Sequence, residues 1–174
     1  MIIWLNGPFG VGKTTTAASL LKNSANWRVF DPEHVGYMLQ ANLKDLDFGD
    51  FQHLQPWRNL VPHTLREVER LTATNLIAPQ SVLVKDYWDE LKTKMTDLGL
   101  EVFHVVLNCD ENVLAKRIED DKIDRDACVW RTEHIAQYSQ ARTWMTAFAD
   151  LTIDTSALTP DQISTAILGT LRWK

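Results

Sequence analysis

The chain has 174 residues, of which 45% are hydrophobic and 24% are charged, and its formal net charge is −5. This balance is typical of a soluble globular protein and predicts one domain spanning residues 1–174. The sequence has no basic run that would predict nucleic-acid binding and no apolar stretch near the roughly 20 residues of a membrane span. Because the first motif begins at residue 7, we expect no cleavable signal peptide.

Short apolar runs alternate with longer amphipathic runs along the chain. In chain order, the predicted strands are Ile2–Leu5, Trp27–Phe30, Val82–Lys85, Val102–Leu107 and Leu151–Ile153. The predicted helices are Lys13–Lys22, Pro32–Leu39, Trp57–Ala73, Trp88–Leu98, Glu111–Glu119, Val129–Phe148 and Pro160–Leu171. This alternation is typical of βαβ units, so we predict an α/β fold of three layers with a five-stranded parallel sheet.

Residues 7–14 match the phosphate-binding pattern G-x-x-x-x-G-K-[ST], and they lie between the first predicted strand and the first predicted helix. Glycines at these positions let backbone N–H groups surround a polyphosphate, and the helix start adds partial positive charge. We expect Lys13 to reach the β and γ phosphates and the Thr14 hydroxyl to hold Mg²⁺. The residues predicted to bind a nucleoside triphosphate are Gly7, Pro8, Phe9, Gly10, Val11, Gly12, Lys13, Thr14 and Thr15.

Two later stretches show no regular pattern. Residues 40–56 mix charge, glycine and aromatic side chains, and residues 119–128 are densely charged. In a doubly wound fold, such segments lie beyond the carboxyl ends of the strands, where ligands bind. We therefore predict an acceptor-binding insertion at about residues 40–73 and a lid at about residues 117–131.

Three classes of P-loop protein are compatible with the loop alone. A GTPase needs a guanine-reading Asn-Lys-x-Asp, whereas the nearest string, at residues 42–45, is Asn-Leu-Lys-Asp. Transporter and motor ATPases have longer domains and further signatures. The length, the insertion and the lid favour a P-loop NTPase with the fold of the nucleoside and nucleotide kinases. Such enzymes act mainly by positioning the substrates and by neutralising charge on the transferred phosphoryl group.

A kinase site needs one carboxylate near the acceptor hydroxyl and another near the metal ion. Asp31 follows the second predicted strand, where it would orient the acceptor and take its proton, with Glu33 nearby. The same Asp-Pro-Glu string also suits a helix start, with Asp31 as the N-cap. Asp86 follows the third predicted strand, as in a Walker B element, and would bind Mg²⁺ through water. It is equally suited to cap the helix from Trp88.

Positive charge over the phosphates is expected from arginines of the lid. Arg117 is the leading candidate for this catalytic role, and Arg125 and Arg131 follow it. Five acidic residues in the same segment could pair with the arginines or form a solvated charged loop.

The insertion is richer in aromatic residues than a surface loop usually is. Aromatic faces with a few polar groups suit a planar or sugar-like ligand. The alternative is that Phe51 and Trp57 are core residues that anchor the insertion. The residues predicted to bind the acceptor are Asp31, Glu33, Phe51, Gln52, Trp57 and Arg58.

Three strings together resemble the tunicamycin-resistance protein family: residues 1–14, Phe30-Asp31-Pro32-Glu33 with Gly36, and Asp50-Phe51-Gln52 with Trp57-Arg58. These are small P-loop proteins related to nucleoside, nucleotide and chloramphenicol kinases. The resemblance is strong over the first 60 residues and looser beyond them. It implies the nucleoside-kinase fold, a site that includes the loop, Asp31 and Arg117, and contact of the segment around Thr155 with adenine.

The leading functional hypothesis is an ATP-dependent phosphotransferase. With ATP and Mg²⁺, it would transfer the γ-phosphoryl group to a hydroxyl of a small nucleoside-like or antibiotic acceptor, which would confer tunicamycin-type resistance. The alternative is a protein that sequesters or senses its ligand in a nucleotide-dependent way without phosphotransfer. Cys109 and Cys128 lack metal-ligand spacing, which indicates reduced thiols in a cytoplasmic protein. We expect no nucleic-acid partner, and either a monomer or a homodimer.

Overall fold

The computed structural model describes residues 1–120 and 128–171, and only the backbone of residues 128–133. Within these residues the sheet has five strands, all parallel, in the order β2-β3-β1-β4-β5. The α/β fold class predicted from the sequence is confirmed. The strands are β1 (Ile2–Asn6), β2 (Trp27–Val29), β3 (Asn75–Pro79), β4 (Val102–Asn108) and β5 (Leu151–Asp154).

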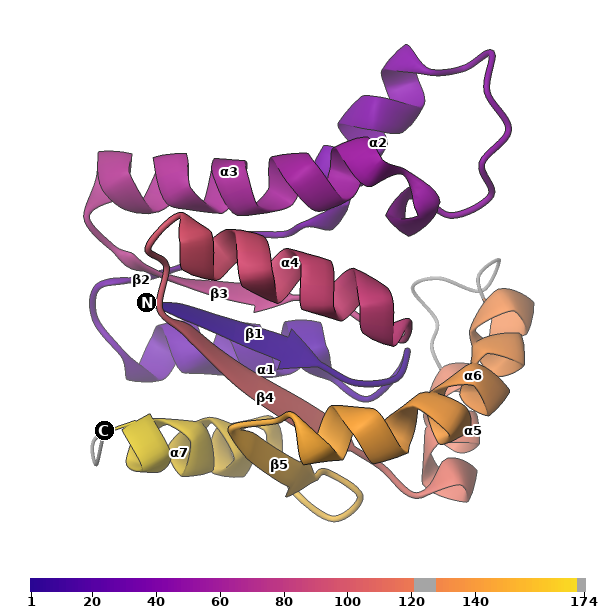
Figure 1. Ribbon diagram of the computed structural model, residues 1–174. Coiled ribbons are helices and arrows are strands. Elements are labelled where there is room, and N and C mark those ends of the chain that lie inside the picture. Colours follow the sequence, from indigo (N-terminus) through magenta and orange to yellow (C-terminus); the bar gives the residue numbers. More distant parts are fainter. Residues whose placement is uncertain (121–127, 172–174) are drawn as a thin grey trace.

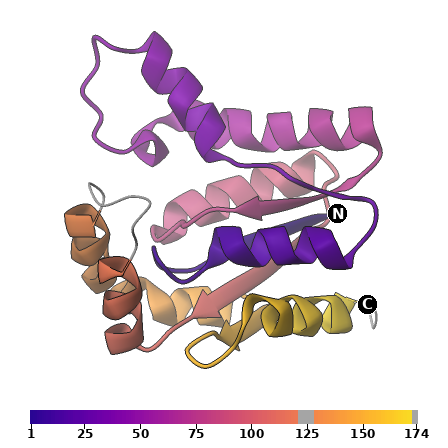
Figure 2. The ribbon, with the colours of Figure 1, turned by 180° about the vertical axis from the view of Figure 1, so that it is seen from behind.

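Helices cover both faces of the sheet, which gives the three predicted layers (Figures 1 and 2). One hydrophobic core includes side chains of α1 (Lys13–Asn23), α5 (Glu111–Glu119) and α7 (Pro160–Leu171). On the other face, the cores include α2 (Glu33–Asn42), α3 (Gln55–Thr72), α4 (Lys85–Asp97) and α6 (Cys128–Ala147). A short 3₁₀ turn, η1 (Phe51–His53), lies between α2 and α3. No helix in these described ranges is long and apolar enough to cross a membrane.

The central strand β1 joins the two cores. Ile3 and Leu5 pack with α1 and α7, whereas Ile2 and Trp4 pack with α3 and α4. This division follows from the alternation of side chains along a strand. Because both faces of a parallel sheet are covered, all five residues of β1 are buried. The strand therefore has a rigid frame on both sides, and the phosphate-binding loop begins at its carboxyl end.

The prediction of a strand at Val82–Lys85 is wrong. The third strand is β3, which lies between β1 and β2, and α4 already begins at Lys85. The sequence pointed to Val82–Lys85 for two reasons. Its β-branched residues have a higher strand propensity than residues 75–79, and a proline such as Pro79 is unusual in a central strand. Pro79 is accommodated because it is the last residue of β3, where Leu5 is its partner. The other predicted strands and helices are confirmed, with differences only at their ends.

The end of β1 is tied to its neighbours by the buried side chain of Asn6. Its Oδ1 accepts hydrogen bonds from the backbone N–H groups of Gly7 and Val82, both at 2.9 Å. Its Nδ2 donates to the carbonyl oxygen of Val82 at 3.2 Å and lies 3.4 Å from Nε2 of His104. One carboxamide therefore connects the start of the loop, the segment after β3, and β4.

His104 completes this network as a neutral imidazole. It is buried on β4 and stacks on Trp88, with ring centroids 4.0 Å apart. Its Nδ1 lies 3.2 Å from the carbonyl oxygen of Phe148, which can only accept, so Nδ1 bears the proton and Nε2 accepts from Asn6. Burial lowers the pKa of His104 to about 4, against a smaller opposing effect of the Phe148 hydrogen bond. The side chain is therefore uncharged at neutral pH.

Acid should weaken the fold through His104. Between the ordinary pKa of 6.5 and the folded pKa of about 4, the unfolded chain binds a proton that the folded protein does not. This group should therefore lower the free energy of unfolding by about 2 kcal/mol from pH 7 to pH 5, as measured by urea denaturation. The His104→Gln variant should lack this contribution, and His63→Gln, at an exposed position of α3, should retain it. Equal pH dependence in wild type and His104→Gln would contradict the assignment.

Candidate functional site

The phosphate-binding loop follows β1 directly. Gly7 has a φ of +143°, and a β-carbon there would lie 2.4 Å from the carbonyl oxygen of Leu107, so only glycine allows the loop to approach β4 this closely. Helix α1 starts at Lys13, immediately after Gly12, and no side chain caps its first turn. Uncapped N–H groups at a helix start are the arrangement that binds a phosphate.

Lys13 and Thr14 stand at the start of α1, as predicted. The Lys13 ammonium donates to the carbonyl oxygens of Gly7 and Pro8, at 3.2 and 2.8 Å, and the Thr14 side chain is exposed. Among the described residues, no group of three or more His, Cys, Asp or Glu side chains could hold a metal ion. The exposed Thr14 hydroxyl fits Mg²⁺, which is often held by one or two protein oxygens together with substrate phosphates.

A small cleft of about 290 Å³ opens beside the loop, between α1, α5 and the segment after β5. Two N–H groups of the Arg117 guanidinium donate to Thr155, at 2.8 Å to its carbonyl oxygen and 3.1 Å to its hydroxyl. The Thr155 hydroxyl donates in turn to the carbonyl oxygen of Asn108 at 3.0 Å. Two residues predicted from distant parts of the sequence, Arg117 and Thr155, thus lie together on one wall of this cleft, with Gly10 and Gly12 of the loop also lining it.

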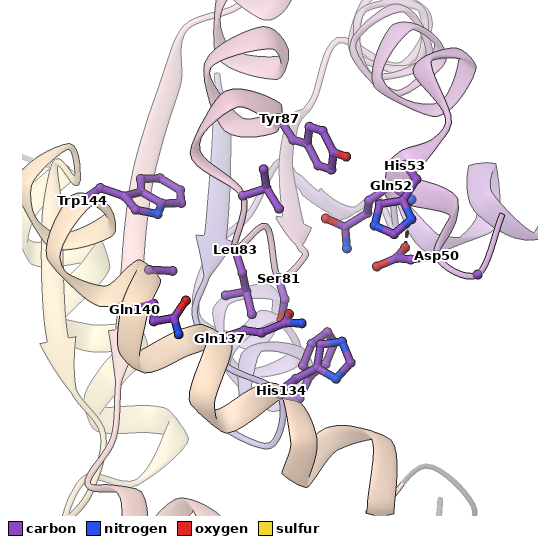
Figure 3. Close-up of a pocket in the computed structure, with 14 residues that line it drawn as sticks. Asp50, Gln52, His53, Ser81, Leu83, Tyr87, His134, Gln137, Gln140 and Trp144 are labelled. Carbon is purple, nitrogen blue, oxygen red and sulfur yellow. Dashed lines mark hydrogen bonds between the residues drawn. The ribbon is translucent and has the colours of Figure 1, made fainter.

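A larger cleft of about 720 Å³ meets the same loop at Phe9. Residues 49–53, residues 81–87 and residues 134–144 each contribute to its wall (Figure 3). The loop therefore borders two clefts, with Phe9 in the larger one and Gly10, Val11 and Gly12 in the smaller one. This arrangement would leave a polyphosphate in the loop within reach of both clefts.

One face of α6 forms a wall of the larger cleft (Figure 3). Positions three or four residues apart share a face of a helix. The face toward the cleft carries His134, Gln137, Ala141 and Trp144, and Gln140 lies beside it. The His134 ring also meets the Phe9 ring edge-on, with centroids 5.5 Å apart. Helix α6 thus contacts the loop as well as lining the cleft.

The adjoining face of α6 fixes the helix to the sheet. Tyr138 is buried, and its hydroxyl donates a hydrogen bond to the side-chain oxygen of Asn108 at the end of β4. Burial raises the pKa of Tyr138 to about 12, so the phenol stays protonated and keeps its role as donor. Asn108 also accepts from Thr155 through its backbone carbonyl oxygen. The two clefts are therefore built on a common support at the carboxyl end of β4.

The insertion presents Asp50, Gln52 and His53 to the larger cleft. The Asp50 carboxylate accepts a hydrogen bond from the backbone N–H of Gln52 at 2.8 Å, which starts η1. The intervening Phe51 points away and packs against Gly36, Tyr37 and Trp57. The predicted acceptor residue Gln52 therefore lines the cleft, and Phe51 supports it from behind.

Two further residues predicted to bind the acceptor, Trp57 and Arg58, do not line the larger cleft. Trp57 is fully buried, and its indole N–H donates to the carbonyl oxygen of Pro32 at 3.0 Å, so it is a core residue. Arg58 is 8% exposed and forms an ion pair with Glu90 at 3.0 Å. Its guanidinium carbon lies 4.2 Å from the ring centre of Tyr87, a residue of the cleft wall. Arg58 therefore braces the wall and does not line the cleft.

Neither Asp31 nor Glu33 lines either of the two clefts. The Asp31 carboxylate accepts from the backbone N–H of Glu33 at 2.9 Å, as expected for the start of α2, and Glu33 accepts from the Tyr37 hydroxyl. Asp86 is exposed in the first turn of α4. The strand-end position on which its metal role was based does not exist, because β3 ends seven residues earlier, at Pro79.

Part of the predicted lid lies outside the described residues. Residues 121–127, with Arg125, are not described, nor is the side chain of Arg131, and Arg117 belongs to α5. Sequence reasoning missed Ser81, Tyr87 and the cleft-facing side chains of α6. The signal for the latter was the spacing of His134, Gln137, Ala141 and Trp144, which repeats at three and four residues.

Comparison with known proteins gives the class of the molecule. A family model described as "AAA domain" matches residues 3–144. Together with the glycine-rich loop between β1 and α1, this match makes the chain a P-loop nucleotide-binding protein. No curated protein matches the chain by sequence.

Among solved structures, the tunicamycin resistance protein of Deinococcus radiodurans is 30% identical, with a TM-score of 0.73 over 98% of this chain and 94% of that chain. The chain belongs to the tunicamycin-resistance protein family. A sugar kinase from Janibacter sp. HTCC2649 is 16% identical, with a TM-score of 0.66 over 98% of this chain and 94% of that one. A shikimate kinase from Bacteroides thetaiotaomicron is 17% identical, with a TM-score of 0.66 over 100% and 99%. The fold is that of small-molecule kinases.

The contact between Gly36 and Phe51 predicts a clear effect of substitution. A β-carbon on Gly36 would lie 2.6 Å from the Phe51 ring, whereas one on Gly169 of α7 would meet nothing within 4 Å. Gly36→Ala should therefore lower the free energy of unfolding by about 1–3 kcal/mol through overpacking. Gly169→Ala should raise it by up to about 1 kcal/mol, because alanine favours the helix. Urea denaturation measures both, and a stabilised Gly36→Ala variant would contradict the packing described for η1.

Proposed function

We propose that the protein is an ATP-dependent phosphotransferase that moves the γ-phosphoryl group of ATP to a hydroxyl of a small nucleoside-like or antibiotic acceptor. The observation that carries this proposal is the position of the loop between two clefts of unequal size. If the adenine of ATP lay in the smaller cleft and the acceptor in the larger cleft, the terminal phosphate of ATP would lie between the two clefts. A sequence relation to a tunicamycin resistance protein, and a fold shared with sugar and shikimate kinases, support the same reading.

The donor half of the site would be formed by the loop and the smaller cleft. Backbone N–H groups of the loop and the start of α1 would bind the phosphates, and Lys13 would neutralise their charge. Adenine would lie beside Arg117 and Thr155, whose hydrogen bonds hold that wall in place. Mg²⁺, when bound at Thr14, would reduce the charge between the β and γ phosphates. Arg117 would thus contact the nucleotide from α5, next to the adenine ring, and not from a lid.

In the transfer step, the acceptor hydroxyl oxygen forms a bond to the γ phosphorus. The bond from that phosphorus to the β–γ bridging oxygen breaks, and ADP leaves with the electron pair. The hydroxyl proton passes to a carboxylate, which we assign to Asp31 at the carboxyl end of β2. Little covalent chemistry is asked of the protein, because phosphoryl transfer depends mainly on alignment and charge neutralisation.

One observation favours the alternative, a ligand-sequestering protein without phosphotransfer. Asp31 is engaged in capping α2 and does not line the larger cleft. Mass spectrometry of nucleosides, sugars and hydroxylated antibiotics after incubation with ATP and Mg²⁺ separates the two functions. A gain of one phosphoryl mass supports the kinase, whereas tight binding of a ligand with no mass change supports sequestration.

Removing the charge of Lys13 or Asp31 should strongly reduce turnover. Lys13→Ala removes a cation from the phosphates, and we expect ADP release with a phosphorylated acceptor to fall at least about 100-fold. Asp31→Asn keeps the helix cap but loses the base, and we expect a similar fall. Asp47→Asn, at an exposed position of the insertion, is the matched control and should keep the wild-type rate. Wild-type turnover by Asp31→Asn would remove Asp31 from the mechanism.

Arg117 should contribute to nucleotide affinity. Arg117→Ala removes the guanidinium that is bonded to Thr155 in the smaller cleft, and we expect the Kd for ATP to rise about tenfold, as measured by calorimetry. Lys116→Ala removes the same charge from an exposed neighbour on α5 and should change the Kd less than about twofold. Equal effects of the two substitutions would show that Arg117 acts only through long-range charge.

A further inference from the structure

Arg58 carries the one full charge among the buried side chains of the described residues, with 8% of its surface exposed. Burying a charge is costly unless the group is paired and hydrogen-bonded. The guanidinium of Arg58 meets this condition through contacts with two elements outside its own helix α3, namely η1 and α4. Both elements contribute residues to the wall of the larger cleft.

On the side of η1, Arg58 fixes the backbone of Gln52. Its Nη1 donates a hydrogen bond to the carbonyl oxygen of Gln52, and the N–H of Gln52 donates to the Asp50 carboxylate at 2.8 Å. The backbone of Gln52 is therefore held on both sides. Gln52 lines the larger cleft although only 7% of the residue is exposed, so the direction from which it reaches the cleft depends on Arg58 (Figure 3).

On the side of α4, the same guanidinium makes two contacts. Its Nε donates to the Glu90 carboxylate at 3.0 Å, and its central carbon lies 4.2 Å from the ring centre of Tyr87. A guanidinium can make both contacts at once because its N–H groups point outward in its plane while its faces remain available for stacking. Tyr87 also lines the larger cleft. One side chain of α3 therefore holds a cleft residue of η1 and a cleft residue of α4.

Further polar contacts keep Glu90 in place for Arg58. The Lys94 ammonium donates to Glu90 at 3.4 Å and to the side-chain oxygen of Asn59 at 2.6 Å, which joins α4 to α3 a second time. The hydrogen bond from Arg58 lowers the pKa of Glu90 from its ordinary value of 4.5, against a smaller opposing effect of burial. The Glu90 carboxylate therefore stays charged at neutral pH.

We propose that Arg58 is a positioning residue of the larger cleft: it sets the placement of Gln52 relative to Tyr87, and through them the affinity for the acceptor, without touching the acceptor itself. The proposal rests on the proposed function in one respect, since it takes the larger cleft to be the acceptor site. The role belongs to the planar shape of the guanidinium and not to its charge alone. Arg58 lines neither of the two clefts, so nucleotide binding should not depend on it.

Two substitutions separate the shape of the guanidinium from its charge. Arg58→Lys keeps the positive charge, but an ammonium cannot make all the contacts of the guanidinium at once. Glu90→Gln removes the negative charge of the partner but keeps a side-chain oxygen that accepts from Nε. Arg70→Lys, in the exposed ion pair with Glu67 on the same helix, is the matched control.

Hydrogen exchange measures the positioning without any ligand, in the peptide that contains residues 51–54. We expect exchange in this peptide to be at least about fivefold faster in Arg58→Lys, and within about twofold of wild type in Glu90→Gln and in Arg70→Lys. Wild-type exchange in Arg58→Lys overturns the proposal. Faster exchange over the whole chain, or a larger effect of Glu90→Gln than of Arg58→Lys, overturns it as well, because these results would indicate general stability or charge.

Calorimetry gives the readout at the cleft itself, with uridine, glucose and shikimate as probes and a non-hydrolysable ATP analogue and Mg²⁺ present. For each probe that binds the wild type, we expect Arg58→Lys to raise the Kd at least about tenfold, and to change the Kd of the ATP analogue less than about twofold. Unchanged affinity for the probe, or equal weakening of both ligands, overturns the proposal. A panel in which no probe binds the wild type would instead contradict the proposed function, and hydrogen exchange would then decide the role of Arg58.

Discussion

The carboxamide of Asn6 fixes the point from which both clefts are built. It lies at the end of the central strand, and its four hydrogen-bonding contacts reach Gly7, Val82 and His104. Buried polar groups are costly when unpaired, so the carboxamide allows only one relative placement of these three segments. The Ser81 hydroxyl adds a bond to the carbonyl oxygen of Gly7 at 2.8 Å. The start of the phosphate loop is therefore held from both neighbouring strands before any nucleotide binds.

From this point the structure separates two chemical environments. On one side, Arg117 brings positive charge to a small cleft bordered by the glycines of the loop. On the other side, Asp50 and three carboxamides line a larger cleft with aromatic surface. Asn108 links the two, because its side chain accepts from Tyr138 of α6 and its backbone accepts from Thr155. The phosphate-binding loop lies between these two environments.

The sequence was sufficient to predict those parts of the fold for which one local signal dominated. The loop motif and the alternation of apolar and amphipathic runs located four of the five strands, and the resemblance to the tunicamycin-resistance family was correct. The prediction failed for β3 because strand pairing outweighed local propensity. The proposed metal role of Asp86 had assumed a strand that ends directly before this residue, so it lost that support. The sequence left open whether Trp57 packs in the core or contacts a ligand, because an aromatic residue in an insertion has no sequence signature that separates packing from binding. Gln137 and Gln140 were missed because a polar helix face looks the same whether it meets solvent or a ligand.

The most direct test of the account is a crystal structure with a non-hydrolysable ATP analogue and Mg²⁺. We expect the adenine beside Arg117 and Thr155, the phosphates along residues 7–14, and the terminal phosphate at the side of the loop where Phe9 borders the larger cleft. Adenine bound in the larger cleft, or a terminal phosphate directed away from it, would contradict the division of the site into a donor half and an acceptor half.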